Sequence, residues 1–367
     1  MSIQKEAKNF LHFLDKKWNY SRDLLREKDL EKVHELRSDL QKIAKGKVFR
    51  EDAEQVFEQT PKQLEKFWPG CTKPNPWAEN IEVFFVALVI AFALRCYFVQ
   101  PFKIPTDSMK PTLWGIYPES IEGDGSPNIL KQVVDYAVGG KSYHKLVADQ
   151  DGILEKVEAG PSYLFLGTTK IRFAGHEHTM WTDFDTFKKL FGGQIPLGKQ
   201  YQKGDVIANF SVQAGDHIFV NKVAYNFRLP KQGEVFVFTT KDIRDPQLLY
   251  ATKGVTQYYI KRCVGVPGVT LKVSEPYLYS NNQILESRAF ERIYSKQDGY
   301  RGYFNAGNYM ATANDEVYIP EDKFWAMGDN SANSLDSRYW KYVPRQNLVG
   351  TAFIVYWPIT SRWGFIQ

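Results

Sequence analysis

The chain has 367 residues, of which 43% are hydrophobic and 24% charged, so its composition is that of a folded protein rather than a disordered one. Its formal net charge of +5 is too small for the dense basic surface of a nucleic-acid-binding protein. The three cysteines lie far apart in the sequence, which excludes a disulfide framework and a four-cysteine zinc site.

The first 80 residues have the pattern of polar helices. Phe10, Leu14 and Trp18 recur at intervals of four, as on one face of a helix, and a similar apolar stripe runs from Val33 to Ile43. Residues 1–20 are polar and mixed in charge, without the apolar core of a signal peptide. We expect residues 1–80 to form a helical region with a structural or docking role.

The first strongly apolar run covers residues 81–99. Its centre, Val83–Leu94, has no charged residue, and Glu82 and Arg95 stand near its two ends. As a helix it would be about 28 Å long, close to the thickness of a bilayer's hydrocarbon core. We predict a transmembrane helix at 81–99; a buried helix of a soluble core is the alternative. Each flank offers three basic residues, so charge does not set the orientation of the helix.

Short β-runs separated by turn residues dominate the second half of the chain. They are His217–Lys222, Glu234–Thr239, Tyr258–Val264, Val269–Val273, Glu316–Ile319 and Thr351–Trp357. This pattern is typical of an antiparallel β domain. The predicted fold class is therefore mainly β, preceded by the helical N-terminal region and one transmembrane helix.

Three distant segments contain residues that hydrolases use. Phe102–Leu113 places Ser108 in a turn between two prolines, and Met327–Arg338 is a dense cluster of turn-forming and hydroxyl residues. Tyr259–Gly268 places Lys261 in an apolar, alternating strand. Lys261 either faces solvent from this strand or is buried, in which case desolvation would lower its pKa and leave a neutral amine.

Taken in order, these segments resemble the sequence boxes of the bacterial type I (leader) signal peptidases, which are membrane-anchored serine proteases with a Ser/Lys dyad. Ile-Pro-Thr-Asp-Ser-Met-Lys-Pro-Thr-Leu resembles the nucleophile box, and Tyr-Ile-Lys-Arg-x-Val-Gly-x-Pro-Gly resembles the lysine box. Gly-Asp-Asn-Ser-x-x-Ser-x-Asp-Ser-Arg resembles the final box. The resemblance covers about residues 100–115 and 215–357.

The resemblance implies a role for each matching residue. Ser108 would be the nucleophile that forms an acyl-enzyme, and Lys261 the general base, with Ser334 hydrogen-bonded to its amine. The Ser108 N–H and the Thr106 hydroxyl would form the oxyanion hole. Two structural ion pairs would join Arg262 to Asp329 and Asp336 to Arg338. Small apolar substrate pockets would be lined by Phe102, Ile104, Pro105, Val237, Tyr259 and Ile260.

The resemblance also implies the partners and the location. The substrates would be signal peptides of translocated preproteins, cut after an Ala-x-Ala-type site at the surface of a lipid bilayer. The family needs no cofactor or metal, and we expect no nucleic-acid partner. The protein would cross the bacterial inner (plasma) membrane once, with residues 1–80 in the cytoplasm and the catalytic domain on the outer, periplasmic side.

Two stretches depart from the family pattern. Residues 116–205 have no counterpart in it, and we interpret them as an inserted subdomain that interrupts a catalytic β domain of residues 100–115 and 206–367. Lys241–Gln257 similarly lengthens the approach to Lys261. Within the insertion, His176-Glu177-His178 lacks a third ligand at helical or hairpin spacing, so we predict no metal site.

Other protein classes fit the sequence less well. The β-lactamase class needs Ser-x-x-Lys and Lys-Thr-Gly, but Pro111 stands where the lysine would be, and Lys-Thr-Gly does not occur. A self-cleaving repressor-type protease would be soluble. A membrane-anchored assembly protein without enzymatic activity would have no need for Ser108, Lys261 and Ser334 together.

Overall fold

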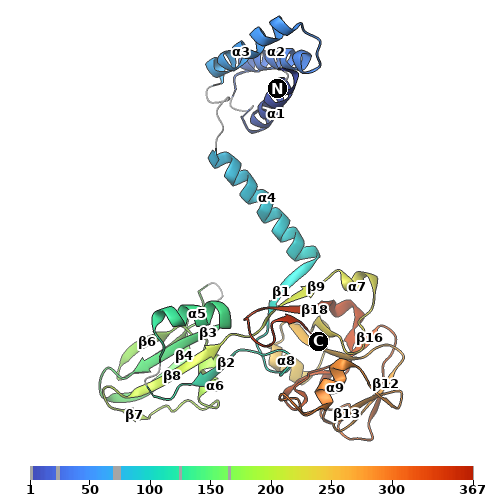
Figure 1. The fold of residues 1–367 in the computed structure, drawn as a ribbon. Helices are drawn as coiled ribbons and strands as arrows, with labels where there is room; N and C mark the ends of the chain where they lie inside the picture. Colours follow the sequence, from blue (N-terminus) through green and yellow to red (C-terminus); the bar gives the residue numbers. More distant parts are fainter. Residues whose placement is uncertain (1–2, 22–24, 69–75, 124–125, 164–166, 367) are drawn as a thin grey trace. The chain divides into compact units, whose positions relative to one another are not determined.

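The computed structural model describes residues 3–21, 25–68, 76–123, 126–163 and 167–366, and the statements below concern these residues. The chain forms two compact units, Met1–Ile90 and Ala91–Gln367, each described here by itself. Figure 1 shows the first unit as helices and the second as a set of β-sheets.

The first unit is helical, as the sequence predicts. It contains α1 (Ile3–Ser21), α2 (Glu27–Ala44), α3 (Arg50–Phe67) and the beginning of α4 (Pro76–Tyr97). The first three helices bury an apolar cluster that includes Leu14, Leu40 and Leu64, which is the packing expected of amphipathic helices.

Helix α4 contains the predicted span. Its segment Asn80–Tyr97 is long and apolar enough to cross a membrane, and the large apolar side chains from Ile81 to Leu94, except Leu88, are about half exposed or more, unlike those of a core helix. The helix begins before the predicted residue 81 and ends at Tyr97 rather than at residue 99. Val99 instead begins a strand, where it pairs with Asn221.

The second unit is built mainly from antiparallel strands, which confirms the predicted fold class. Its largest sheet has the order β1-β9-β18-β10-β11-β16-β17, with β19 beside β18. The strands are β1 (Val99–Lys103), β9 (His217–Asn221), β18 (Leu348–Trp357), β10 (Val235–Thr239), β11 (Tyr258–Gly265), β16 (Lys323–Met327), β17 (Val343–Pro344) and β19 (Gly364–Phe365). Each predicted β-run in these positions corresponds to a strand.

A second sheet and four short helices complete this part. The sheet has the order β14-β13-β12-β15, from β12 (Thr270–Ser274), β13 (Tyr277–Ser280), β14 (Gln283–Ile284) and β15 (Glu316–Tyr318). The helices are α7 (Ala224–Phe227), α8 (Pro246–Thr252), α9 (Arg288–Tyr294) and α10 (Ser337–Trp340). Helix α8 occupies the lengthened approach to Lys261 that the sequence indicated.

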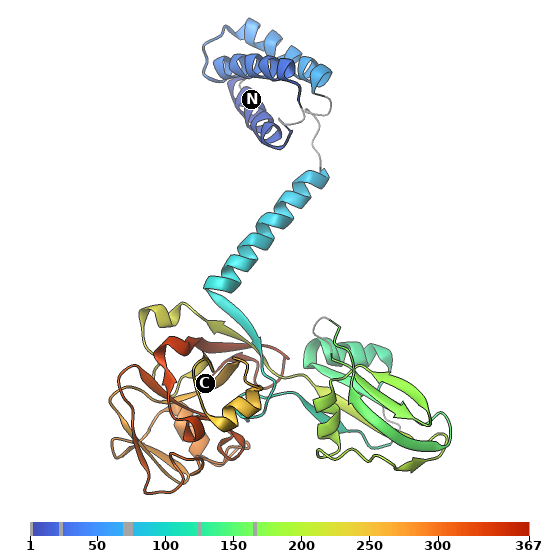
Figure 2. The same ribbon diagram turned by 180° about the vertical axis from the view of Figure 1, so that it is seen from behind.

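The residues between Gly115 and Gly215 form a separate lobe (Figure 2). One sheet has the order β2-β8-β3 and the other β6-β5-β4-β7, around a core that includes Phe173, Phe187 and Phe210. The elements are β2 (Tyr117–Ser120), α5 (Ile129–Gly139), β3 (Lys141–Val147), β4 (Gly152–Ala159), β5 (Thr169–Phe173), β6 (His176–Met180), α6 (Phe184–Leu190), β7 (Gln200–Tyr201) and β8 (Val206–Gln213). Because β8 pairs with β2 and β3, the lobe extends to Gln213, beyond the predicted boundary at 205.

Candidate active site

Ser108 lies in the turn that follows β1. The turn is held from within, since the Lys110 N–H donates to the Asp107 carbonyl and the Asp107 carboxylate accepts from the Gly115 N–H at 3.0 Å. Met109 is fully buried directly after Ser108 and anchors the turn in the apolar core. The Ser108 side chain is thereby fixed in a buried position, while Thr106, two residues earlier, is exposed.

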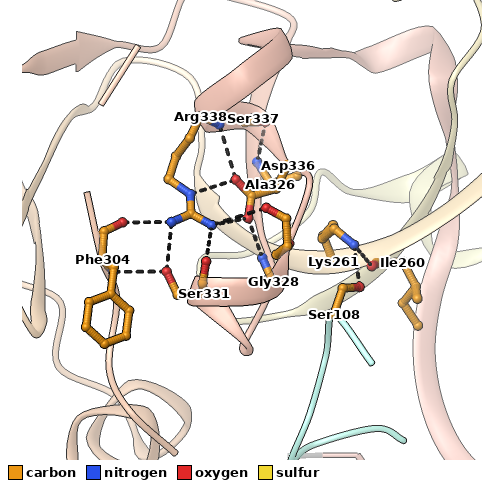
Figure 3. A network of polar contacts seen from close by, with 11 residues as sticks. Ser108, Ile260, Lys261, Phe304, Ala326, Gly328, Ser331, Asp336, Ser337 and Arg338 are labelled. Carbon is orange, nitrogen blue, oxygen red and sulfur yellow. Dashed lines mark hydrogen bonds and ion pairs between the residues drawn. The ribbon is translucent and has the colours of Figure 1, made fainter. Parts of the chain in front are cut away.

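Lys261 points at Ser108 from β11. Its Nζ lies 2.7 Å from the Ser108 Oγ and 3.2 Å from the Ile260 carbonyl oxygen, and Figure 3 shows the two side chains facing each other. Lys261 is 4% exposed, so the structure selects the buried alternative of the two that the sequence left open.

Burial changes the protonation of Lys261. Desolvation lowers the pKa of its amine to about 8, although the charges of Asp336 and Asp329 act in the opposite direction. An amine with a pKa of about 8 is neutral in about one molecule in ten at pH 7, far more often than a free lysine. It can therefore accept a proton from the hydroxyl that it contacts.

Two buried ion pairs lie close to this dyad. Arg262 holds Asp329 through two hydrogen bonds of 2.8 and 2.6 Å, and Arg338 holds Asp336 through two of 2.8 Å. Arg338 also donates to the Ser331 hydroxyl and carbonyl and to the Phe304 carbonyl (Figure 3). These bidentate contacts satisfy charges that would be costly to bury alone, and they fix the loop from Met327 to Arg338.

The loop from Met327 to Arg338 also holds the turn that contains Ser108. The residues that make these contacts were not among those predicted to have a role. Asn330 donates from its backbone to the Ser108 carbonyl at 3.1 Å and from its side chain to the Asp107 carbonyl at 3.0 Å. The Thr112 hydroxyl donates to the Asp329 carboxylate at 2.5 Å. Both residues lie within the segments quoted above. Their amide and hydroxyl side chains, which commonly form hydrogen bonds to loop backbone and carboxylates, were the only feature of the sequence that could have indicated these contacts.

Gly328 allows the two segments to approach closely. A Cβ at this position would lie 2.3 Å from the Ser334 Oγ and 2.4 Å from the Ser108 carbonyl oxygen. No larger residue fits between the two loops without moving one of them.

The structure does not contain the expected hydrogen bond between Ser334 and the Lys261 amine. Ser334 is buried beside Gly328, and its hydroxyl has no hydrogen-bond partner among the described residues. The amine instead contacts Ser108 and the Ile260 carbonyl. The Ile260 carbonyl thus accepts a hydrogen bond from the Lys261 amine, which the resemblance had implied would be bonded to Ser334.

The residues expected to line substrate pockets divide into two groups. Ile104 and Val237 are buried, and Phe102 and Ile260 pack against them in one apolar cluster. Tyr259 belongs to a different cluster and packs against Phe238 and Trp340, because successive residues of a strand face opposite sides of the sheet. Pro105 is exposed beside the nucleophile turn.

The His-Glu-His segment of the lobe lies on β6, where Glu177 forms an ion pair with Lys170 of β5. No group of three or more metal-ligating side chains occurs in the part of the chain that the structure describes.

Comparisons with known proteins converge on one family. The family model for signal peptidase, peptidase S26, matches residues 77–117 and 203–357. The chain is 31% identical over 153 residues to the probable signal peptidase I-2 of Synechocystis sp. (strain ATCC 27184 / PCC 6803 / Kazusa), covering 41% of this chain and 58% of the relative. It is 31% identical over 155 residues to the probable signal peptidase I-1 of the same organism, covering 42% and 68%.

The signal peptidase I of Leptolyngbya laminosa is 30% identical over 153 residues, which covers 41% of this chain and 64% of the relative. The chain thus spans 58% and 64% of the length of the first two curated relatives. The family match leaves out residues 118–202, which lie within the separate lobe.

Proposed function

This chain belongs to the signal peptidase family, peptidase S26, and on that premise we propose that it is a membrane-anchored serine endopeptidase that removes N-terminal signal peptides from secreted preproteins. The observation that carries the proposal is the 2.7 Å contact between the buried Lys261 amine and the Ser108 hydroxyl, from segments 153 residues apart. Burying a lysine that has no carboxylate in direct contact lowers the stability of the fold, so its presence here is best explained by a catalytic role.

The proposed reaction begins with attack of the Ser108 Oγ on the scissile carbonyl carbon, while the neutral Lys261 amine takes the hydroxyl proton. The resulting oxyanion accepts hydrogen bonds from the Ser108 N–H and the Thr106 hydroxyl. Lys261 then gives its proton to the departing amine as the C–N bond breaks and a Ser108 ester forms. Water, deprotonated by Lys261, hydrolyses the ester and regenerates Ser108.

The substrate would bind as an extended strand near β1, an edge strand of its sheet that leads into the nucleophile turn. Phe102 and Ile260, which are only partly buried where they pack against Ile104 and Val237, would contact alternate side chains of such a strand. The family resemblance implies shallow apolar pockets for small residues at this place, which is the basis for proposing an Ala-x-Ala-type cleavage site. The proposed partners are therefore signal peptides and the lipid bilayer.

We further propose a single-pass topology in a bacterial inner membrane. The helical region before α4 would be cytoplasmic, and Asn80–Tyr97 of α4 would be the transmembrane segment. The catalytic domain on the outer side would begin at Val99, be interrupted by the lobe that ends at Gln213, and continue from Ala214. Protease added to spheroplasts should digest only the part that follows the span. Digestion of residues 1–80 with protection of the remainder would reverse the orientation.

Cleavage of a synthetic signal peptide with an Ala-x-Ala site tests the activity. The wild-type protein in detergent should cut the peptide once, after the second alanine, and Ser108→Ala should abolish cleavage. Ser126→Ala, which changes an exposed serine of the lobe, is the matched control and should leave the rate unchanged. Equal cleavage rates for the wild type and Ser108→Ala would contradict the proposal and favour a membrane-anchored assembly protein without enzymatic activity.

Thr106 provides a finer test of the oxyanion hole. Thr106→Ser keeps a hydroxyl and should keep most of the activity, whereas Thr106→Val should lower kcat by about 10²–10³-fold, the usual loss for one such donor. An unaffected Thr106→Val enzyme would place the second donor elsewhere.

A further inference from the structure

Helix α5 of the lobe exposes its apolar residues, unlike an ordinary surface helix. Its large apolar residues are 45–80% exposed, and the helix has no buried residue. They are Ile129, Leu130, Val133, Val134, Tyr136 and Val138. Surface helices of soluble proteins turn such residues toward the core and their polar residues toward water.

Two of the three polar residues of α5 face the protein instead, while Lys131 is exposed. Gln132 and Asp135 are half-buried, and the Asp135 carboxylate accepts a hydrogen bond of 2.6 Å from the Tyr143 hydroxyl of β3. The Gln132 side chain donates to the Pro127 carbonyl, directly before the helix, at 2.8 Å. The bond to Tyr143 ties α5 to β3 with its apolar side outward.

The end of α5 is joined to the catalytic sheet. The Trp357 Nε1–H donates to the Ala137 carbonyl at 2.9 Å, and the Ile359 N–H donates to the Val138 carbonyl at 2.8 Å. The exposed apolar surface continues beyond this junction, where Ile359, Trp363 and Phe365 are 56–77% exposed. Aromatic and aliphatic residues exposed together in this way mark a surface that meets an apolar partner.

The position of α5 in its unit identifies that partner. Helix α4, the candidate span, ends at Tyr97, and β1 begins two residues later at Val99. In both views α5 lies on the side of the second unit at which β1 begins (Figures 1 and 2). A chain that leaves a bilayer at this point keeps that side of the unit close to the lipid headgroups.

We propose that α5 docks its apolar side into the interface of the bilayer that α4 spans, as a second membrane contact of the protein. The proposal rests on the membrane anchoring in the proposed function. With 11 residues α5 is about 17 Å long, too short to cross the hydrocarbon core, so it lies along the interface. Because Trp357 and Ile359 link α5 to β18, this contact sets the height and tilt of the sheet that carries the Ser108 turn.

Fluorescence quenching by lipids tests the contact without relying on cleavage. The full chain, with Cys71→Ser and Cys96→Ser, is labelled with an environment-sensitive fluorophore at Val133→Cys and placed in phosphatidylethanolamine/phosphatidylglycerol vesicles with brominated acyl chains. The remaining Cys263 is buried. The label should emit at shorter wavelength and be quenched, whereas a label at Val255→Cys, an exposed site after α8, should be neither.

Two results would overturn the proposal. Water-like, unquenched emission at position 133 would show that α5 stays in solvent. Blue-shifted emission without quenching by brominated lipid would show that protein, such as a second copy of the chain, covers the helix. In either case detergent assays of the wild type still report peptide cleavage, so failure of this proposal is distinguishable from failure of the proposed function.

Cleavage of a membrane-inserted preprotein provides a second readout. The triple variant Leu130→Gln, Val133→Gln and Val134→Gln should cut this substrate about tenfold more slowly, which corresponds to about 1.4 kcal/mol of docking free energy. The same variant should cut a short peptide in detergent at the wild-type rate. Leu249→Gln, Tyr250→Gln and Val255→Gln, three exposed apolar residues in or near α8, form the matched control and should change neither rate. Equal losses on both substrates would mean that the α5 variant damages the fold.

Discussion

The inserted lobe, between Gly115 and Gly215, and the catalytic part, which is the rest of the second unit, both enclose apolar cores. They differ in whether charged side chains are buried. The catalytic part buries seven charged side chains: Asp216, Asp245, Lys261, Arg262, Asp329, Asp336 and Arg338. In the lobe, the described buried polar side chains are all neutral: Thr168, Thr169, Thr182, Thr186, Asn209 and Ser211. Five of these seven charges, Lys261 and the pairs Arg262–Asp329 and Asp336–Arg338, belong to the Ser108 site or lie close to it.

The ion pairs show the same contrast. Arg262 and Asp329 are 1% and 0% exposed, whereas Lys170 and Glu177 of the lobe are 37% and 44% exposed. An exposed pair contributes little to stability, while a buried pair is expensive to form and more expensive to break. The buried charges thus mark positions where the fold is less stable than an apolar core would be, but where side chains are held in fixed positions. Four predictions test this contrast.

The largest effect is expected from Lys261→Arg. Arginine keeps the positive charge but cannot become a neutral base, so the rate of peptide cleavage should fall by about 10⁶-fold, the order of loss for a catalytic unit missing one member. Circular dichroism should show an intact fold. Lys156→Arg, the same change on an exposed strand of the lobe, is the matched control and should leave the rate unchanged.

The pH profile sharpens the same prediction. Because the folded pKa of Lys261 is lowered to about 8, the amine loses its proton as the pH rises through that value, and wild-type activity should rise along a limb with its midpoint there. Substantial cleavage by Lys261→Arg, or a limb near the free-lysine pKa of about 10.4, would rule out the buried amine as the base.

The second prediction breaks one ion pair in each region. Asp329→Asn leaves the buried Arg262 without its counter-charge and should lower the free energy of unfolding of the catalytic part by about 3–5 kcal/mol. Glu177→Gln breaks the exposed pair of the lobe and should cost about 0–1 kcal/mol. Denaturant unfolding of the full chain in detergent measures both. Similar costs for the two variants would remove the energetic distinction between the regions.

The third prediction concerns the fit between the two catalytic loops. The Cβ introduced by Gly328→Ala would lie far too close to the Ser334 Oγ and the Ser108 carbonyl, so Ser108 should shift and kcat should fall by about 10²-fold. Gly139→Ala in α5 is the matched control, because a Cβ there meets no atom within 4 Å. A fully active Gly328→Ala enzyme would mean that the Ser108 turn tolerates displacement.

The candidate dyad and most strands of the catalytic part could be predicted from the sequence, although the contrast with the lobe could not. The resemblance of three segments to the signal peptidase boxes implied that Ser108 and Lys261 meet, and turn residues between alternating runs indicated the strands. The exceptions depend on spatial neighbours. Tyr259 lies on the sheet face opposite Ile260, and the hydrogen bond expected from Ser334 to Lys261 is replaced by one to the Ile260 carbonyl.

The lobe was the least predictable region. Val206–Gln213 has the composition of any buried strand, and only its pairing with β2 and β3 assigns it to the lobe. The apolar residues of α5 would be expected to face a core from sequence alone. Their outward orientation accompanies the bond between Asp135 and Tyr143 of β3, which the periodicity of the helix does not specify.

The smallest effect on peptide cleavage is expected when the lobe is removed altogether. The two ends of the lobe meet, since the Asp216 N–H donates to the Trp114 carbonyl at 2.9 Å and the Trp114 N–H donates to the Asp216 carboxylate at 2.8 Å. A short Gly/Ser linker in place of residues 117–213 can therefore join Ile116 to Ala214 without displacing the Ser108 turn.

The excised protein should cut a short peptide in detergent close to the wild-type rate, because the buried charges, the dyad and the loop from Met327 to Arg338 all remain. Ser108→Ala in the same background should abolish that activity, which excludes a contaminating protease. Cleavage of a membrane-inserted preprotein should be slower, because α5 is lost with the lobe. A well-folded excised protein that fails on the short peptide would show that the lobe builds part of the active site, and its interpretation as an accessory lobe would then be wrong.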